Sequence, residues 1–223
     1  MSIETVLLIL ESVLLAATIV LLLYSIREGK ERRGLLLEVG KATKILTRQE
    51  YFLTVKDSMM DAQDEIVGFI TGRPPTEDDR KRIKDIIHNI EQLTAKGIKV
   101  RYMMPKFHDR LQVGYLYTKA GAEIRFSACA IANNIRYIVI DSRAAVIGMP
   151  ECMGEKEATR KGYRIPAEGL ASILKDHFYG CWEESVPYSE YGKEIIEQTG
   201  ASAKVLEKEL HVDSGELERL ASL

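Results

Sequence analysis

Cysteine, tryptophan and net charge are all scarce in this sequence of 223 residues. There is one tryptophan and there are three cysteines, Cys129, Cys152 and Cys181, an odd number that excludes a complete disulfide framework and suits a reducing compartment. Their spacing matches no zinc motif, so we expect no metal site and no cofactor. The net charge of -2 gives no global reason to expect nucleic-acid binding, which usually accompanies a basic excess.

Apolar residues are concentrated at the N-terminus. Residues 5–26 read TVLLILESVLLAATIVLLLYSI and contain one charge, Glu11. A helix of this length would extend roughly 33 Å, enough for a hydrocarbon core of about 30 Å. A buried core helix is the alternative, but such a helix usually has a polar face. A cleaved signal peptide is disfavoured because Glu4 is the only charge before the segment and no small-x-small cleavage site follows.

The charges flanking this segment predict its orientation. Before it stands only Glu4, whereas Arg27, Lys30, Arg32 and Arg33 follow it. Because positive residues remain on the inner side of a membrane, we expect a single-pass protein of the cell membrane with its C-terminal domain in the cytoplasm.

The rest of the chain alternates between strand and helix patterns. We expect a transmembrane anchor at 1–26, a charged helical stalk at 27–48, an α/β domain at 49–185 and a C-terminal helical tail at 186–223. In the domain, strands are expected at 65–71, 98–104, 122–131, 135–141 and 144–148, with helices at 49–64, 76–97, 108–119 and 167–184 and a loop at 151–166. This order predicts a mixed β-sheet flanked by helices. The tail has the spacing of a helix-turn-helix, but its last helix offers Glu216, Glu218 and only Arg219, so a packing or oligomerisation role is favoured over DNA binding.

One stretch carries a family resemblance. Residues 133–152, NNIRYIVIDSRAAVIGMPEC, resemble the phospholipase D superfamily motif, in which His-x-Lys is followed after four residues by Asp and then by Gly-Ser and Asn. At these six positions stand, in order, Asn134, Arg136, Asp141, Gly148, Met149 and Cys152. The order of the elements across 49–185 is also that family's layout. The resemblance implies a phospholipase D-like mixed sheet, and a homodimer in which two copies of the single motif complete one site.

The departures from the motif change the expected chemistry. In the family the histidine attacks phosphorus, and an amide such as Asn134 is neither a nucleophile nor a useful proton donor. Arg136 keeps a positive charge and could hold a phosphate through its fork of N–H donors. Arg136 could instead be a plain strand residue paired with Asp141 or Glu123. Two further cations, Arg73 and Lys106, follow strands and are possible anion contacts.

We therefore expect a membrane-tethered, catalytically degenerate phospholipase D-like domain, with no catalytic residue and with Asn134, Arg136, Asp141, Gly148 and Cys152 as ligand-binding positions. Its expected ligand contains phosphate or another anion, and its role is sensory or scaffolding. One rival is an active phosphodiesterase or nuclease in which His108 or Cys152 replaces the histidine. The other is a membrane-bound transcription regulator that uses the C-terminal helices, although nucleic acid is not the expected partner.

Overall fold

The structure is a computed structural model that describes residues 13–29, 43–45, 48–74, 77–129, 135–148, 162–200, 202–210 and 212–222. The chain divides into two compact units, Met1–Lys41 and Ala42–Leu223.

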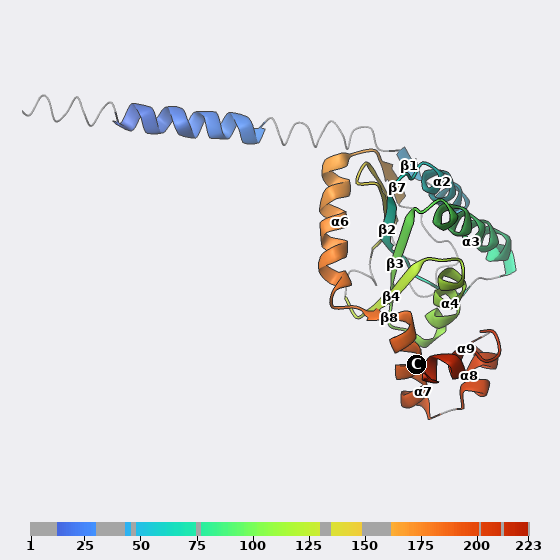
Figure 1. Cartoon of the computed structure of the whole chain (residues 1–223). Coiled ribbons are helices and arrows are strands. Elements are labelled where there is room, and N and C mark those ends of the chain that lie inside the picture. The colour runs from blue at the N-terminus through green and yellow to red at the C-terminus, as the bar shows by residue number, and fades with distance from the viewer. Residues whose placement is uncertain are drawn as a thin grey trace, which may run out of the picture. The chain divides into compact units, whose positions relative to one another are not determined.

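The described part of the first unit is a helix over residues 13–29, drawn in blue in Figure 1. Its apolar side chains are exposed on every face; for example, Leu15 and Leu21 are 64% and 69% exposed. The hydroxyl of Thr18 donates to the carbonyl oxygen of Leu14 at 2.8 Å, so this polar group is satisfied within the helix. Among the described residues, no helix is both long enough and apolar enough to span a membrane. Residues 5–12 of the expected anchor and residues 30–42 of the expected stalk lie outside the described residues.

The second unit is built on one eight-stranded sheet with the order β1-β7-β6-β5-β2-β3-β4-β8. The strands are β1 (Thr43–Ile45), β2 (Glu65–Phe69), β3 (Lys99–Pro105), β4 (Glu123–Ser127), β5 (Arg136–Ile140), β6 (Ala144–Gly148), β7 (Gly162–Ile165) and β8 (Val186–Pro187). The helices are α2 (Arg48–Met60), η1 (Glu77–Asp79), α3 (Arg80–Ala95), η2 (His108–Arg110), α4 (Leu111–Lys119), α6 (Glu168–Trp182), α7 (Tyr188–Thr199), α8 (Ala203–Glu209) and α9 (Glu216–Ser222).

Parallel and antiparallel pairing divide the sheet. The strands β2, β3 and β4 are parallel, as their helical connections through α3 and α4 require. From β2 outward, β5, β6, β7 and β1 pair antiparallel, and β8 pairs antiparallel with β4 at the other edge. Figure 1 shows α6 on one side of the sheet and α2, α3 and α4 on the other. This confirms the predicted mixed sheet flanked by helices.

Each face of the sheet has its own apolar core because successive strand residues point to opposite sides. On β5, Ile138 and Ile140 join the core under α2, α3 and α4, whereas Tyr137 and Val139 join the core under α6. Position 68 of β2 requires glycine because the backbones of β2 and β5 come close there. A Cβ at this position would lie 2.2 Å from the carbonyl oxygen of Tyr137.

The C-terminal helices belong to the same compact unit as the sheet. Leu206 of α8 and Leu217 of α9 are buried in the core that α4 and α7 share. The side chain of Glu207 is also buried, and it accepts hydrogen bonds from the backbone N–H groups of Gly215 (3.0 Å), Leu217 (2.8 Å) and Glu218 (3.4 Å). The carboxylate thus satisfies amides at the start of α9, which a helix cannot pair within itself.

Some expected elements differ from those observed. Residues 162–165, expected to belong to a loop, form β7, and residues 43–45 of the expected helical stalk form β1. The strand expected to reach residue 131 ends at Ser127. Thr76, the first residue of the helix expected at 76–97, lies outside the described residues, and α3 begins at Arg80. Asp79 precedes it and pairs with Arg82 at 2.8 Å without capping the helix.

Candidate ligand-binding site

A cavity of about 110 Å³ lies between the sheet and helices α2 and α3. It adjoins the carboxyl end of β2 and the beginning of β5. Its lining comprises Tyr51, Phe52, Val55, Ile70, Thr71, Gly72, Arg73, Pro74, Asp79, Ile83, Ile86, Tyr102, Val113, Tyr117, Arg136 and Ile138. The wall is mostly apolar or aromatic, and its formal charges are two arginines against one aspartate.

Arg136 reaches the cavity from the first position of β5, on the same face as Ile138. Its guanidinium carbon lies 4.2 Å from the centre of the Tyr51 ring, a cation–π contact with α2. The Nε and Nη2 atoms of Arg136 are buried. Burial raises the pKa of Tyr51 and the charge of Arg136 opposes that rise, so the phenol remains neutral at ordinary pH. Arg136 pairs with neither Asp141 nor Glu123 in any described contact; these two carboxylates bind Arg143 and Arg101.

Arg73 shares the cavity with Arg136, and Arg110 lies near Arg73. Arg73 lines the cavity from the turn that follows β2, where Gly72 has a φ of +59°. Arg110, at the start of α4, is 8% exposed and donates to Asp109 at 2.6 Å. Burial lowers the pKa of Arg110, the Asp109 carboxylate opposes this, and the like charge of Arg73 lowers it further. Arg73 and Arg110 are therefore close enough for their like charges to interact.

The described lining lacks the groups that phosphoryl transfer needs. No histidine or cysteine is present in it, and its one carboxylate, Asp79, is paired with Arg82. Burial raises the pKa values of Tyr102 and Tyr117, so these phenols also stay neutral. The arrangement can hold a small anion with an apolar part, but it offers no evident nucleophile or general base.

The other motif positions are dispersed. Asp141 lies just beyond the opposite end of β5 from Arg136. Its carboxylate accepts hydrogen bonds from the backbone N–H groups of Gln63 (2.8 Å), Asp64 (2.9 Å) and Glu65 (2.9 Å) and pairs with Arg143. It fixes the turn before β2 and does not line the cavity. Gly148 pairs across the sheet with Arg136. Asn134, Met149 and Cys152 lie outside the described residues.

The remaining candidates also lie away from the cavity. Lys106 follows β3 as expected, but its ammonium group binds Glu194 of α7 at 3.0 Å and lies 5.7 Å from the centre of the Tyr191 ring. His108 belongs to η2 and is not among the lining residues.

Sequence reasoning missed two features. Arg110 was not considered because nothing in its sequence surroundings marks it as buried. The second feature is a group of Cys129, His177 and Cys181 on the α6 side of the sheet, with ligand atoms within 4.8 Å of one another. The expectation of no metal site considered cysteine spacing alone, although His177 and Cys181 are four residues apart and therefore share one face of a helix.

Comparison with known proteins identifies the architecture. NucT from Helicobacter pylori superposes with a TM-score of 0.50 at 13% identity, covering 66% of this chain and 98% of NucT. Nuc from Salmonella typhimurium, a phospholipase D family member, gives 0.49 at 12% identity, with coverages of 66% and 99%. The fold of this chain is similar to that of NucT.

At these identities the likeness concerns the fold alone. TrmBL2, an archaeal chromatin protein, has a TM-score of 0.48 at 18% identity over 73% of this chain; the match spans 64% of the TrmBL2 chain. The sequence matches no family model and no curated protein.

Proposed function

We propose that this chain is a membrane-tethered, catalytically silent phospholipase D-like module that binds a small anionic ligand in the cavity lined by Arg73 and Arg136. Its role is sensory or scaffolding, on the cytoplasmic face of the cell membrane. By resemblance to single-motif members of the family, the proposal includes a homodimer.

The position of Arg136 carries the proposal. Its guanidinium lies beside the Tyr51 ring and lines a largely apolar cavity. An apolar side chain at this position would fill the space at lower desolvation cost. Arg136 preserves the positive charge of the motif lysine, and its fork of donors matches phosphate or carboxylate. Arg73 adds a second positive charge at the same cavity.

Catalytic silence is supported by residue chemistry. Asn134 stands at the position of the motif histidine, and the described lining supplies no imidazole or thiol in its place. Without a nucleophile the covalent route of phosphoryl transfer loses its first step.

Membrane tethering is supported by the apolar run at 5–26 and its basic flank. The described part of this run exposes leucine, valine and isoleucine side chains on all faces. A surface of this kind suits hydrocarbon, and a Thr18 hydroxyl satisfied by its own helix suits an environment without water.

The test of ligand binding is thermal unfolding of the purified full chain with and without inorganic phosphate. We expect phosphate to stabilise the wild-type protein and to stabilise Arg136→Ala far less, because losing a charged hydrogen-bonding group costs about 1.5–3 kcal/mol, or roughly ten- to hundredfold in affinity. Arg136→Lys should recover part of the binding, since it restores the charge without the fork.

Arg80→Ala is the matched control, since this exposed arginine pairs with Glu77 on the surface. It should leave the response to phosphate unchanged. Equal stabilisation of wild type and Arg136→Ala would contradict the proposed site. Hydrolysis of bis-nitrophenyl phosphate that disappears in His108→Ala or Cys152→Ser would instead establish the active phosphodiesterase.

A further inference from the structure

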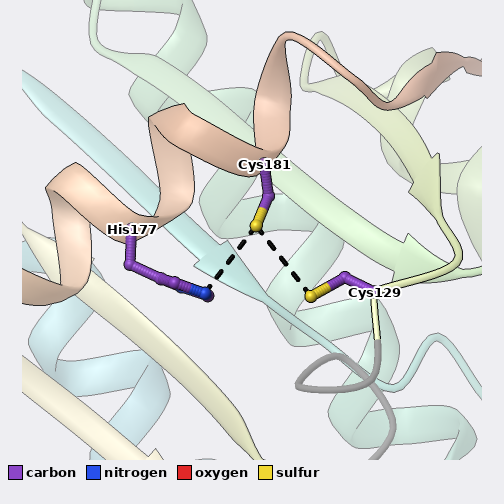
Figure 2. Close-up of side chains that lie close together, drawn as sticks. All are labelled: Cys129, His177 and Cys181. Atoms are coloured by element: carbon purple, nitrogen blue, oxygen red, sulfur yellow. Dashed lines mark hydrogen bonds between the residues drawn. The ribbon is translucent and has the colours of Figure 1, made fainter.

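Three potential metal ligands converge on the α6 side of the sheet (Figure 2). His177 and Cys181 project from consecutive turns of α6, and Cys129 follows the end of β4. The Sγ atom of Cys181 lies 3.9 Å from the Sγ atom of Cys129 and 3.7 Å from Nε2 of His177. All three residues are partly buried beside the core that contains Phe69, Tyr137 and Phe178.

These distances match the edges of a tetrahedral zinc site. With Zn–S of about 2.3 Å and Zn–N of about 2.0–2.1 Å, tetrahedral angles place two sulfur atoms roughly 3.8 Å apart and sulfur and nitrogen roughly 3.6 Å apart. The two distances above are within a few tenths of an ångström of these values. Two sulfur atoms in a disulfide would be only about 2.05 Å apart, so the pair is not a disulfide, and its spacing is compatible with two ligands of one ion.

The hydrogen bonds of Tyr137 determine which nitrogen of His177 is available. The Tyr137 hydroxyl lies 3.0 Å from the carbonyl oxygen of Leu174 and 3.0 Å from Nδ1 of His177. A carbonyl can only accept, so the single phenolic proton is donated to Leu174. The phenolic oxygen then accepts the Nδ1–H of His177, which leaves the Nε2 lone pair directed at Cys181. Fixing of the second ring nitrogen in this way is typical of metal-bound histidine.

We propose that Cys129, His177 and Cys181 bind one Zn²⁺ ion, with Tyr137 positioning His177. Binding releases the two thiol protons to solvent, and two thiolates then balance the charge of the ion, as a partly buried site requires. The described residues supply three ligands, and the fourth tetrahedral position is open to water or another donor.

The proposed ion would connect three parts of the domain. Cys129 begins the segment that leads into β5 and Arg136, α6 supplies two ligands, and Tyr137 of β5 holds the histidine. Zinc would therefore hold Cys129, which precedes the degenerate motif in the chain, against α6. This site is independent of the proposed anion binding, because its ligands do not line the cavity.

The test uses the full chain, purified with reductant, freed of metal and titrated with Zn²⁺ against a chromophoric chelator. We expect one zinc per chain and, with Co²⁺ as a probe, thiolate-to-metal absorption together with the intense visible bands of tetrahedral cobalt. His177→Ala and Cys181→Ser should each lose more affinity than the roughly 10–100-fold expected for the outer-sphere change Tyr137→Phe.

His88→Ala is the control, because His88 is exposed on α3 and should not affect zinc affinity. Thermal unfolding of each metal-free variant shows whether the variant is still folded, so that a lost ligand can be distinguished from an unfolded chain. Absence of zinc binding by the reduced wild-type chain would overturn the proposal, and so would undiminished binding by both Cys181→Ser and His177→Ala. Formation of a Cys129–Cys181 disulfide by a chain that binds no zinc would assign the pair to redox chemistry.

Discussion

At the scale of single residues, the two charged motif positions, at the start of β5 and just after its end, have separate surroundings. Arg136 lines the cavity, whereas Asp141 stabilises the polypeptide turn at the other end of the strand. Burial alone would raise the pKa of Asp141, but hydrogen bonds from the backbone amides of Glu65, Asp64 and Gln63 and from Arg143 outweigh it and hold this pKa below its ordinary value. The carboxylate therefore stabilises the folded state while it is ionised.

Asp141→Asn should lower the free energy of unfolding by about 1.5–3 kcal/mol at neutral pH, because a charged acceptor of several amides is lost. Since the folded-state pKa is lowered, this contribution is complete above the unfolded-state pKa of about 3.9 and disappears as pH falls through the folded-state value. The difference between wild type and variant, measured by denaturant unfolding, should therefore be constant above about pH 5 and shrink in more acidic solution.

Asparagine is the appropriate replacement because Asp141 has a φ of +48°, a conformation that asparagine tolerates. Asp57→Asn, on the exposed face of α2, provides the control and should cost little. A pH-independent difference between wild type and Asp141→Asn would show that the charge of Asp141 is not what stabilises the turn.

At the scale of secondary-structure elements, α9 depends on a side chain from α8. Seven residues are too few for a stable isolated helix, so α9 requires packing and satisfied amides at its start. We expect Glu207→Ala to destabilise the protein by about 1–3 kcal/mol, because buried N–H groups lose their acceptor. Hydrogen exchange should show faster exchange in residues 215–222, and thermal melts should show the loss of stability. Glu209→Ala, exposed on the same helix, should change neither.

The long elements were predictable from sequence, but the short edge strands were not. The apolar spacing of Ile83, Ile86, Ile90 and Leu93 indicates α3, and these side chains are buried. Strands β1 and β8 have three and two residues, too few for a periodic pattern, and they exist because β7 and β4 present edges to pair with. The four residues of β7 follow a charged, glycine-containing stretch that reads as a loop.

The candidate sites were predictable only in part, for a similar reason. Arg73 and Arg136 were identified from strand ends and the degenerate motif, and the fold brings both to one cavity. Their role in ligand binding stays a prediction. Lys106 also follows a strand, but α7, whose packing the sequence does not reveal, supplies Glu194 as its partner. Cys129 and Cys181 are brought together only by the packing of α6 on the sheet.

At the scale of the whole molecule, the division at residue 41 separates the N-terminal helix from the sheet and all of the C-terminal helices. A chain beginning at Ala42 keeps β1 and should be folded, monodisperse and soluble without detergent. The full chain should remain with membranes after an alkaline wash. Circular dichroism and membrane fractionation check both outcomes. Retention of the shortened chain on washed membranes would contradict the proposed anchor.

The alternation of β5 places Arg136 and Tyr137, neighbours in sequence, on opposite faces of the sheet. One peptide unit therefore joins the wall of the cavity to the residue whose hydroxyl contacts His177. If zinc binding changes the position of this peptide, it changes the affinity for the anion by some factor. Thermodynamic reciprocity then requires the anion to change the affinity for zinc by the same factor. In that case β5 would couple the affinities of two ligands that do not contact each other.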